Sequence, residues 1–178
     1  ILLKLKFNEH GEMSRIFLGL GSNVGERFTY LSKAIQEIAD LFTVKSISSI
    51  YETEPWGEKR QQNFLNVVLE IETIETTQKI FSVIKSIEKK IGRVERGKWQ
   101  EREIDIDVLL NESEILETRE LTIPHKELHN RKFVLIPFNE IASDVLHPVF
   151  KKTIAQLLKE CSDESNVRNT NLQLLYQQ

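Results

Sequence analysis

The order of strand-like and helix-like hydrophobic patterns restricts the possible folds of this chain more than any other feature. Strand-like apolar runs cover residues 15–20, 45–51, 64–71 and 104–110. We expect the last of them to be a central strand of the sheet. Between the first two runs, apolar residues recur at helical spacing from Phe28 to Leu41. Four isoleucines between Ile80 and Ile91 mark a second amphipathic helix, which Gly92 ends. The pattern therefore reads β-α-β-β-α-β.

This order is that of the split βαβ, or ferredoxin-like, arrangement. It predicts an α+β domain with a ferredoxin-like βαββαβ core, in which both helices cover one face of the sheet. Residues 121–150 and a helix over 153–161 must then cover other surfaces or extend the sheet, which makes αβα layers with extra C-terminal strand and helix elements. We expect the residues after Ser162 to be frayed, because they are polar.

Length and composition indicate one globular domain. The chain has 178 residues, of which 40% are hydrophobic and 29% charged. We expect the domain to cover residues 13–162, with an N-terminal extension over 1–12 and a C-terminal tail over 163–178. A net charge of −3 argues against nucleic acid as a partner. One cysteine and no long apolar run favour a cytoplasmic protein without a membrane segment.

Two aspartates, Asp105 and Asp107, stand two residues apart in the apolar run over 104–110. In a strand both side chains project from one face, while Ile104, Ile106 and Val108 point to the other. Paired carboxylates are ligands that suit Mg²⁺, which proteins often hold together with substrate phosphates. The alternative is an edge strand with two solvated aspartates.

A basic run precedes the aspartates. Between Arg93 and Arg102 there are four basic residues and two acidic ones, together with Trp99. Guanidinium groups match phosphate oxygens, and an indole ring can stack on a base. The run lacks apolar periodicity, which suggests that residues 95–101 form a mobile lid over a phosphoryl-transfer site. A solvated loop would show the same composition.

Two further segments carry candidate ligand-binding residues. Thr53, Trp56, Phe64 and Asn66 could hold a flat heterocycle between rings while amide and hydroxyl groups read its edge, although aromatic residues in strands are more often core. Asn66 is the most informative of these, since an amide inside an apolar strand needs partners. The glycine-rich stretch over 19–25 does not fit a dinucleotide fingerprint, because its third glycine comes one residue late.

Taken together, the motifs resemble those of the 6-hydroxymethyl-7,8-dihydropterin pyrophosphokinase family. They run in the family's order over residues 15–148: Gly19-x-Gly21-Ser22-Asn23, Tyr51-x-Thr53-x-Pro55-x-Gly57, Phe64-x-Asn66, Gly92-Arg93, Trp99, Arg102-x-x-Asp105-x-Asp107 and Pro124-His125 through Arg131. The resemblance implies transfer of pyrophosphate from ATP to the hydroxymethyl group of the pterin in folate biosynthesis, with release of AMP. It also implies small-molecule substrates as the partners, and ATP as the co-substrate.

The resemblance also implies roles for residues at matching positions. Asp105 and Asp107 would hold two Mg²⁺ ions, while Arg93 and Arg102 would take part in catalysis. The pterin pocket would consist of Thr53, Trp56, Phe64, Asn66 and Phe133, and ATP would contact Glu88, Trp99, Thr122, His125 and Arg131. The chain departs from the family pattern at Glu54, Phe64 and Glu95, and its loop over 93–102 is one residue short.

Two other classes of protein share parts of this pattern. A sugar-nucleotide transferase could use Asp105-x-Asp107 with Mn²⁺, and binding of UDP-sugars would identify it. A regulatory or RNA-binding module could share the fold without an acidic pair, and it would not bind ATP in a metal-dependent way.

Overall fold

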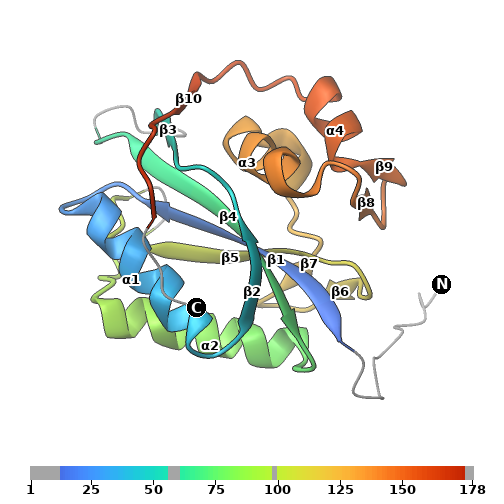
Figure 1. Cartoon of the computed structure of the whole chain (residues 1–178), viewed down its shortest axis with the longest axis horizontal. Helices are drawn as coiled ribbons and strands as arrows, with labels where there is room; N and C mark the ends of the chain where they lie inside the picture. The colour runs from blue at the N-terminus through green and yellow to red at the C-terminus, as the bar shows by residue number, and fades with distance from the viewer. Residues whose placement is uncertain (1–12, 56–60, 98–99, 175–178) are drawn as a thin grey trace.

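The structure is a computed structural model that describes residues 13–55, 61–97 and 100–174 (Figure 1). The predicted mixture of helices and strands in an α+β domain is confirmed. The main elements are β1 (Ser14–Ser22), α1 (Arg27–Ala39), β2 (Thr43–Ile47), β3 (Tyr51–Thr53), β4 (Phe64–Thr73), α2 (Thr77–Ile91), β5 (Asp105–Asn111), α3 (Lys132–Ala142), α4 (Ile154–Glu160) and β10 (Val167–Asn169). The short elements are β6 (Leu116–Glu117), β7 (Thr122–Ile123), the 3₁₀ helix η1 (Leu128–Asn130), β8 (Leu146–His147) and β9 (Lys152–Thr153).

One six-stranded sheet forms the centre of the fold. Its strands follow the order β10-β3-β4-β1-β5, and β2 pairs with β4 beside β3. Every pairing in this sheet is antiparallel. Strand β1 lies between β4 and β5, and its apolar residues Ile16, Phe17, Leu18 and Leu20 are all buried.

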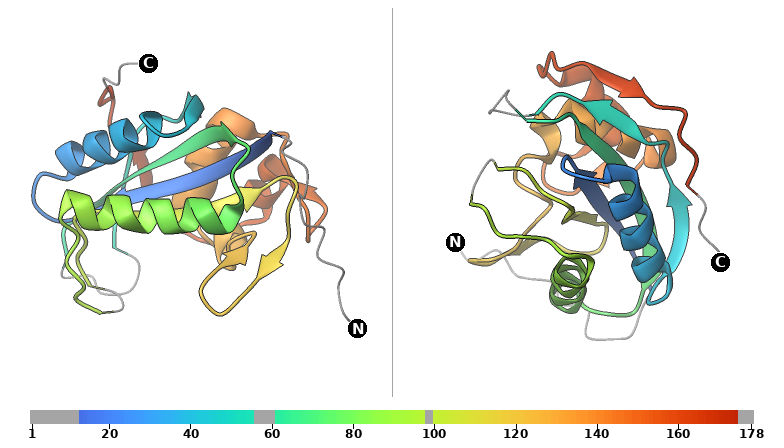
Figure 2. Two further views of the ribbon diagram at one scale, coloured as in Figure 1. Left: turned by 90° about the horizontal axis from the view of Figure 1, so that it is seen from below. Right: turned by 90° about the vertical axis from the view of Figure 1, so that its left-hand side faces the viewer.

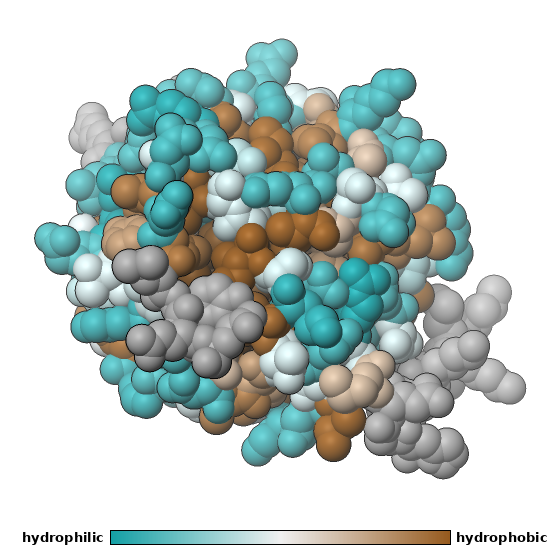
Figure 3. All heavy atoms as spheres, viewed as in Figure 1, coloured by the Kyte–Doolittle hydropathy of each residue, from teal (hydrophilic) through white to brown (hydrophobic). Residues whose placement is uncertain are grey.

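Helices cover both faces of the sheet (Figure 2). On one face, Ile16, Leu18 and Leu20 of β1 belong to a core cluster that includes buried residues of α1 and α2. On the other face, Phe17 packs with buried residues of α3 and α4, and its ring centroid lies 4.6 Å from that of Phe138. Polar side chains cover much of the surface seen in Figure 3, and apolar residues are visible between them.

Local signals explain where the second helix starts and ends. The Thr76 side chain accepts a hydrogen bond from the amide of Lys79, which caps the start of α2. Gly92 ends the helix with φ 106°, a left-handed conformation that favours glycine. Among the described residues, no helix is both long enough and apolar enough to cross a membrane.

The structure corrects three expectations from the sequence. The strand predicted over residues 45–51 is two strands, β2 and β3, because residues 48–50 face only two residues of β4 and interrupt the ladder. The amide of Val68 there donates to the hydroxyl of Ser48 and not to a backbone carbonyl. The run over 104–110 forms an end strand of the sheet and not a central one. The residues after Ser162 are not frayed throughout, because residues 167–169 form β10 and pair with β3.

Candidate functional site

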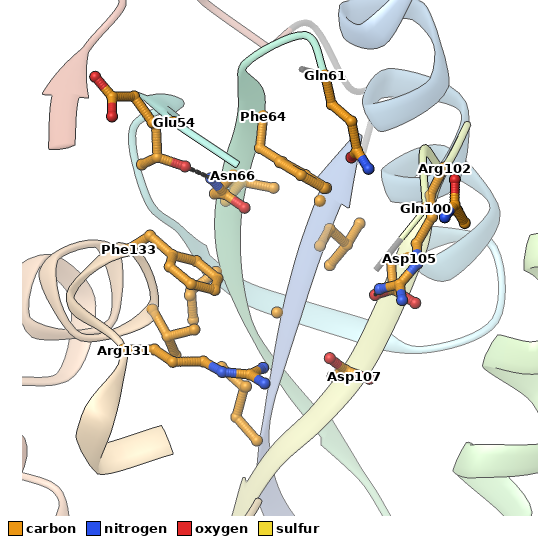
Figure 4. Close-up of a pocket in the computed structure, with 18 residues that line it drawn as sticks. Glu54, Gln61, Phe64, Asn66, Gln100, Arg102, Asp105, Asp107, Arg131 and Phe133 are labelled. Atoms are coloured by element: carbon orange, nitrogen blue, oxygen red, sulfur yellow. Dashed lines mark hydrogen bonds and ion pairs between the residues drawn. The ribbon is translucent and has the colours of Figure 1, made fainter. Parts of the chain in front are cut away.

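A cavity of about 340 Å³ opens between α3 and the ends of β1, β3, β4 and β5 (Figure 4). Eight of the candidate residues line it, and they come from parts of the sequence as far apart as residues 53 and 133: Thr53, Phe64, Asn66, Arg102, Asp105, Asp107, Arg131 and Phe133. Trp56 and Trp99, which were also predicted, lie outside the described residues, as does part of the predicted lid over 95–101. The fold therefore gathers most of the described candidates around one space.

One end of the cavity presents an amide between two aromatic rings. Asn66 is only 6% exposed, and its Nδ2 donates a hydrogen bond of 2.8 Å to Oγ1 of Thr53 on the neighbouring strand. This hydrogen bond fixes the orientation of the amide, as the sequence argument required. Phe64 reaches the cavity from β4, and Phe133 reaches it from α3 (Figure 4).

Glycines form the floor below the amide. A Cβ atom placed on Gly21 would lie 3.2 Å from Oδ1 of Asn66 and 3.5 Å from the ring of Phe64. A Cβ atom on Gly19 would lie 3.1 Å from a methyl group of Leu109. Both glycines line the cavity. The glycine-rich stretch thus allows close packing of the cavity floor, because glycine has no side chain to occupy this space.

The acidic pair lies at the other end of the cavity, on β5. Asp105 and Asp107 face the cavity, while Ile106 and Val108 are buried among α1 and α2 residues on the opposite face. The prediction that both aspartates share one face of a strand is confirmed. Carboxylate oxygens are suitable ligands for a hard divalent cation. The described residues contain no cluster of three or more acidic, histidine or cysteine side chains that could hold a metal ion without further ligands.

Two arginines contact the first aspartate. Nη1 of Arg93 lies 2.6 Å from Oδ1 of Asp105, and Arg102 forms an ion pair with Oδ2. Burial opposes ionisation of this carboxyl group, but Arg102, Arg93 and Lys85 outweigh it and hold the pKa of Asp105 below its ordinary value. Asp105 therefore remains ionised at neutral pH.

Glu88 lies behind this ion-pair group. It is 3% exposed, and its Oε1 accepts hydrogen bonds from the amide of Ile106 at 2.6 Å and from Lys85 at 2.8 Å. The same oxygen lies 2.6 Å from Nη1 of Arg93. Burial raises the pKa of Glu88, although Lys85 and Arg93 oppose the shift. In this arrangement Glu88 supports Arg93 and is not among the residues that line the cavity.

Of the remaining candidates, His125 contacts a residue that lines the cavity. The amide of His125 donates to the carbonyl of Leu109 at 2.8 Å, and its Nδ1 accepts from the amide of Glu127 at 3.2 Å. Burial lowers the pKa of His125, although the nearby Asp107 opposes the shift. Thr122 pairs with Glu117 in the small β6-β7 sheet, and neither Thr122 nor His125 lines the cavity.

Asn23 is a residue whose role the sequence argument missed. It is fully buried, and its Oδ1 accepts from the amide of Arg102 at 2.8 Å. Its Nδ2 donates to Oε1 of Gln61 at 3.0 Å, and its own amide donates to the carbonyl of Arg102 at 3.0 Å. Asn23 thus connects three separate segments at the rim of the cavity. Its place in the glycine-rich stretch did not predict these contacts, because long-range partners leave no local signal.

The chain resembles known proteins over most of its length. Residues 17–143 match the family model described as 7,8-dihydro-6-hydroxymethylpterin-pyrophosphokinase (HPPK). A protein of Aquifex aeolicus called 2-amino-4-hydroxy-6-hydroxymethyldihydropteridine pyrophosphokinase is 43% identical over 148 residues, which cover 83% of this chain and 92% of that protein. A Haemophilus influenzae protein of the same name is 35% identical over 158 residues, covering 88% and 98%.

The fold also has solved counterparts. A crystal structure of Plasmodium falciparum HPPK-DHPS A437G superposes with a TM-score of 0.68 at 16% sequence identity. The alignment covers 86% of this chain and 46% of the Plasmodium chain, so this chain spans about half the length of that protein. At this level of identity, the superposition supports the shared fold alone.

Proposed function

Because this chain belongs to the 7,8-dihydro-6-hydroxymethylpterin-pyrophosphokinase family, we propose that it transfers pyrophosphate from ATP to 6-hydroxymethyl-7,8-dihydropterin and releases AMP. The observation that carries the proposal is the division of one cavity into two ends. An oriented amide and two phenylalanines lie at one end, and a carboxylate pair with arginines lies at the other. A flat heterocycle and a phosphate chain are ligands of matching chemistry.

We assign the pterin to the end formed by Thr53, Phe64, Asn66 and Phe133. The two rings would lie against the faces of the heterocycle, and stacking of this kind prefers aromatic partners. The amide of Asn66 has donor and acceptor atoms, and its hydrogen bond to Thr53 prevents it from turning away from the ligand. Such preorganisation lowers the entropy that binding would otherwise cost. We also assign Trp56 to the pterin pocket, because it lies between Pro55 and Gly57 of the family motif.

We assign the phosphate groups of ATP to the end with the acidic pair. Asp105 and Asp107 are hard oxygen donors that fit Mg²⁺, with phosphate oxygens and water completing its ligands, and the family resemblance implies two such ions. Bound Mg²⁺ would supply charge neutralisation for the phosphate groups. Arg93 and Arg102, which contact Asp105 in the structure, can turn to phosphate oxygens when ATP enters.

The chemical step then depends on position and charge. The pterin hydroxyl attacks the β-phosphorus of ATP, the bond from this phosphorus to the α-phosphate oxygen breaks, and AMP leaves. Arg93 and Arg102 would stabilise the charge that develops in this step. For contacts to ATP, we retain Glu88, Trp99, Thr122, His125 and Arg131. Of these, Glu88 would act mainly through Arg93, because its carboxylate is already occupied.

We also infer that the fold is the ferredoxin-like βαββαβ core with αβα layers. The sheet order and the placement of α1 and α2 against one face support this inference. The predicted domain over residues 13–162 omits β10, whose pairing with β3 supports including residues up to 169.

The test is to incubate the protein with ATP, Mg²⁺ and 6-hydroxymethyl-7,8-dihydropterin and to separate the products by chromatography. We expect AMP and a pyrophosphorylated pterin in equal amounts, and no reaction in EDTA. Formation of ADP in place of AMP would refute attack at the β-phosphorus. Loss of ATP at the same rate without the pterin would refute the proposed substrate.

A further inference from the structure

The N-terminal end of helix α3 borders the cavity, and polar contacts attach the helix to the rest of the molecule at both ends. Arg131 directly precedes the helix and Phe133 lies in its first turn, and both line the cavity. Glu140 lies seven residues after Phe133, which is two helical turns and about 10 Å along the axis. Glu140 and Phe133 therefore lie on the same stripe of the helix.

The N-terminal end is capped from a distant segment. Arg131 occupies the cap position, but its side chain makes no capping hydrogen bond. Instead, Oδ2 of Asp163 accepts a hydrogen bond of 2.8 Å from the amide of Lys132. Its Oδ1 accepts from the amide of Ser165 at 2.9 Å, which holds the carboxylate in place. A carboxylate here also complements the positive end of the helix dipole.

The C-terminal end is attached to the segment that enters β3. The carboxylate of Glu140 accepts hydrogen bonds from the amide of Ser49 at 3.0 Å and from its hydroxyl at 2.8 Å. The hydroxyl of Tyr51, the first residue of β3, donates to Oε2 at 3.0 Å. Burial, followed by the bond to Glu140, raises the pKa of Tyr51, so the hydroxyl remains a donor at neutral pH. Thr53, which binds Asn66, lies two residues further along the same strand.

The same C-terminal segment that caps α3 also binds β3. After Asp163, residues 167–169 form β10 and pair with β3. Arg168 forms an ion pair with Glu52, and the amide of Thr170 donates to the carbonyl of Ile50 at 3.0 Å. Helix α3 and strand β3, which both contribute residues to the pterin end, are thus connected twice, once through Asp163 and once through Glu140.

These polar attachments fix the position of α3 along its axis, which the apolar core alone does not. Leu135 and Phe138 hold α3 against the sheet, but hydrophobic contact is not directional and tolerates a small slide along the helix axis. Hydrogen bonds depend steeply on distance and angle, so bonds at both ends determine the axial position. We propose that Asp163 and Glu140 are positioning residues that set the distance of Phe133 from Thr53 and Asn66, and with it the affinity for the pterin. This inference rests on the proposed function.

The test compares alanine variants, which remove each attachment, with amide variants, which keep one acceptor oxygen. In Asp163→Ala and Glu140→Ala, we expect KM for the pterin to rise about tenfold, or about 1.4 kcal/mol, while kcat changes by less than about twofold. Asp163→Asn should restore much of the affinity, because the asparagine oxygen can still accept from the amide of Lys132, although its NH2 group cannot accept from Ser165. Glu140→Gln should also retain it, because the amide oxygen can accept from Ser49. Calorimetric titration with the pterin, Mg²⁺ and a non-hydrolysable ATP analogue provides an independent affinity.

A matched control separates positioning from general stability. Glu160, like Glu140, is exposed, but it pairs with Lys152 and does not line the cavity, so Glu160→Ala should leave KM unchanged. If Asp163→Ala and Glu140→Ala lowered the melting temperature but bound the pterin normally, the inference would be wrong. It would be equally wrong if Asp163→Asn bound the pterin as weakly as Asp163→Ala.

Two further results cover an alanine variant that does not fold and a failure of the proposed function itself. If an alanine variant does not fold, the double variant Ser49→Ala with Tyr51→Phe removes both side-chain donors to Glu140, and an unchanged KM in this milder variant would overturn the role of Glu140. A wild-type protein that neither binds the pterin nor forms AMP would refute the proposed function itself. An active wild-type protein with unaffected variants would refute only the positioning role.

Discussion

Glu103 attaches the basic loop to the start of β5, and its charge should contribute to stability in a pH-dependent way. Its Oε2 accepts from the amide of Val94 at 3.1 Å and from Nη1 of Arg96 at 2.9 Å, while Oε1 pairs with Nη2 of the same arginine. The residue is 7% exposed. The hydrogen bonds from Arg96, together with the one from Val94, outweigh burial and lower the pKa of Glu103 to about 2.

The size of the effect follows from linkage. Lowering the pKa from 4.5 to about 2 corresponds to at most about 3 kcal/mol of stability. The Arg96 side chain is 34% exposed, so solvent screens the pair and we expect about 1–2 kcal/mol. Because the folded-state pKa is below the unfolded one, this stability is complete above pH 4.5 and is lost as the pH falls towards 2. Glu103→Gln should therefore destabilise the protein at pH 7 but not near pH 2.

Urea unfolding followed by circular dichroism at pH 7, 5, 4 and 3 measures the difference directly. The matched control is Glu95→Gln, which removes an exposed carboxylate from the same loop and should change stability by less than about 0.5 kcal/mol. Equal stability of wild type and Glu103→Gln at pH 7 would refute the reasoning. A difference that stayed constant between pH 7 and pH 3 would refute the assignment of the effect to this charge.

Three further predictions concern the cavity. Asp107→Asn should lower kcat by about three orders of magnitude in steady-state assays with a nearly unchanged melting temperature, because it removes a proposed Mg²⁺ ligand. Near-normal activity at saturating Mg²⁺ would contradict that role. Arg102→Ala should reduce kcat at least about tenfold more than pterin affinity, and the reverse pattern would exclude a role in phosphate transfer. Gly21→Ala should weaken calorimetric pterin binding about tenfold, since the new Cβ would lie 3.2 Å from Oδ1 of Asn66. Wild-type affinity in this variant would show that the cavity floor accommodates the added methyl group, and it would refute the prediction.

Local patterns in the sequence were sufficient for the main elements of the sheet and for the helices on one of its faces. The isoleucines of α2 repeat every turn, and Gly92 marks its end, so neighbouring residues alone specify this helix. The common face of Asp105 and Asp107 followed from the two-residue period of a strand. The helix α3 was missed, because Pro137 lies inside it and its apolar residues are nearly continuous. The assignment of individual site residues came from the family resemblance.

Residues a few positions apart specify β1, α1, β4, α2 and β5 and place the two carboxylates of β5 on one face, so these features could be predicted from the sequence. What the side chains contact could be known only from the folded structure. The amide of Asn66 is oriented by Thr53, Asn23 connects segments 38 and 79 residues away, and Asp163 caps a helix that begins 31 residues before it. Hydrogen bonds and ion pairs of this kind depend on distance in space, and a distance in space across a folded sheet leaves no periodic signal along the chain.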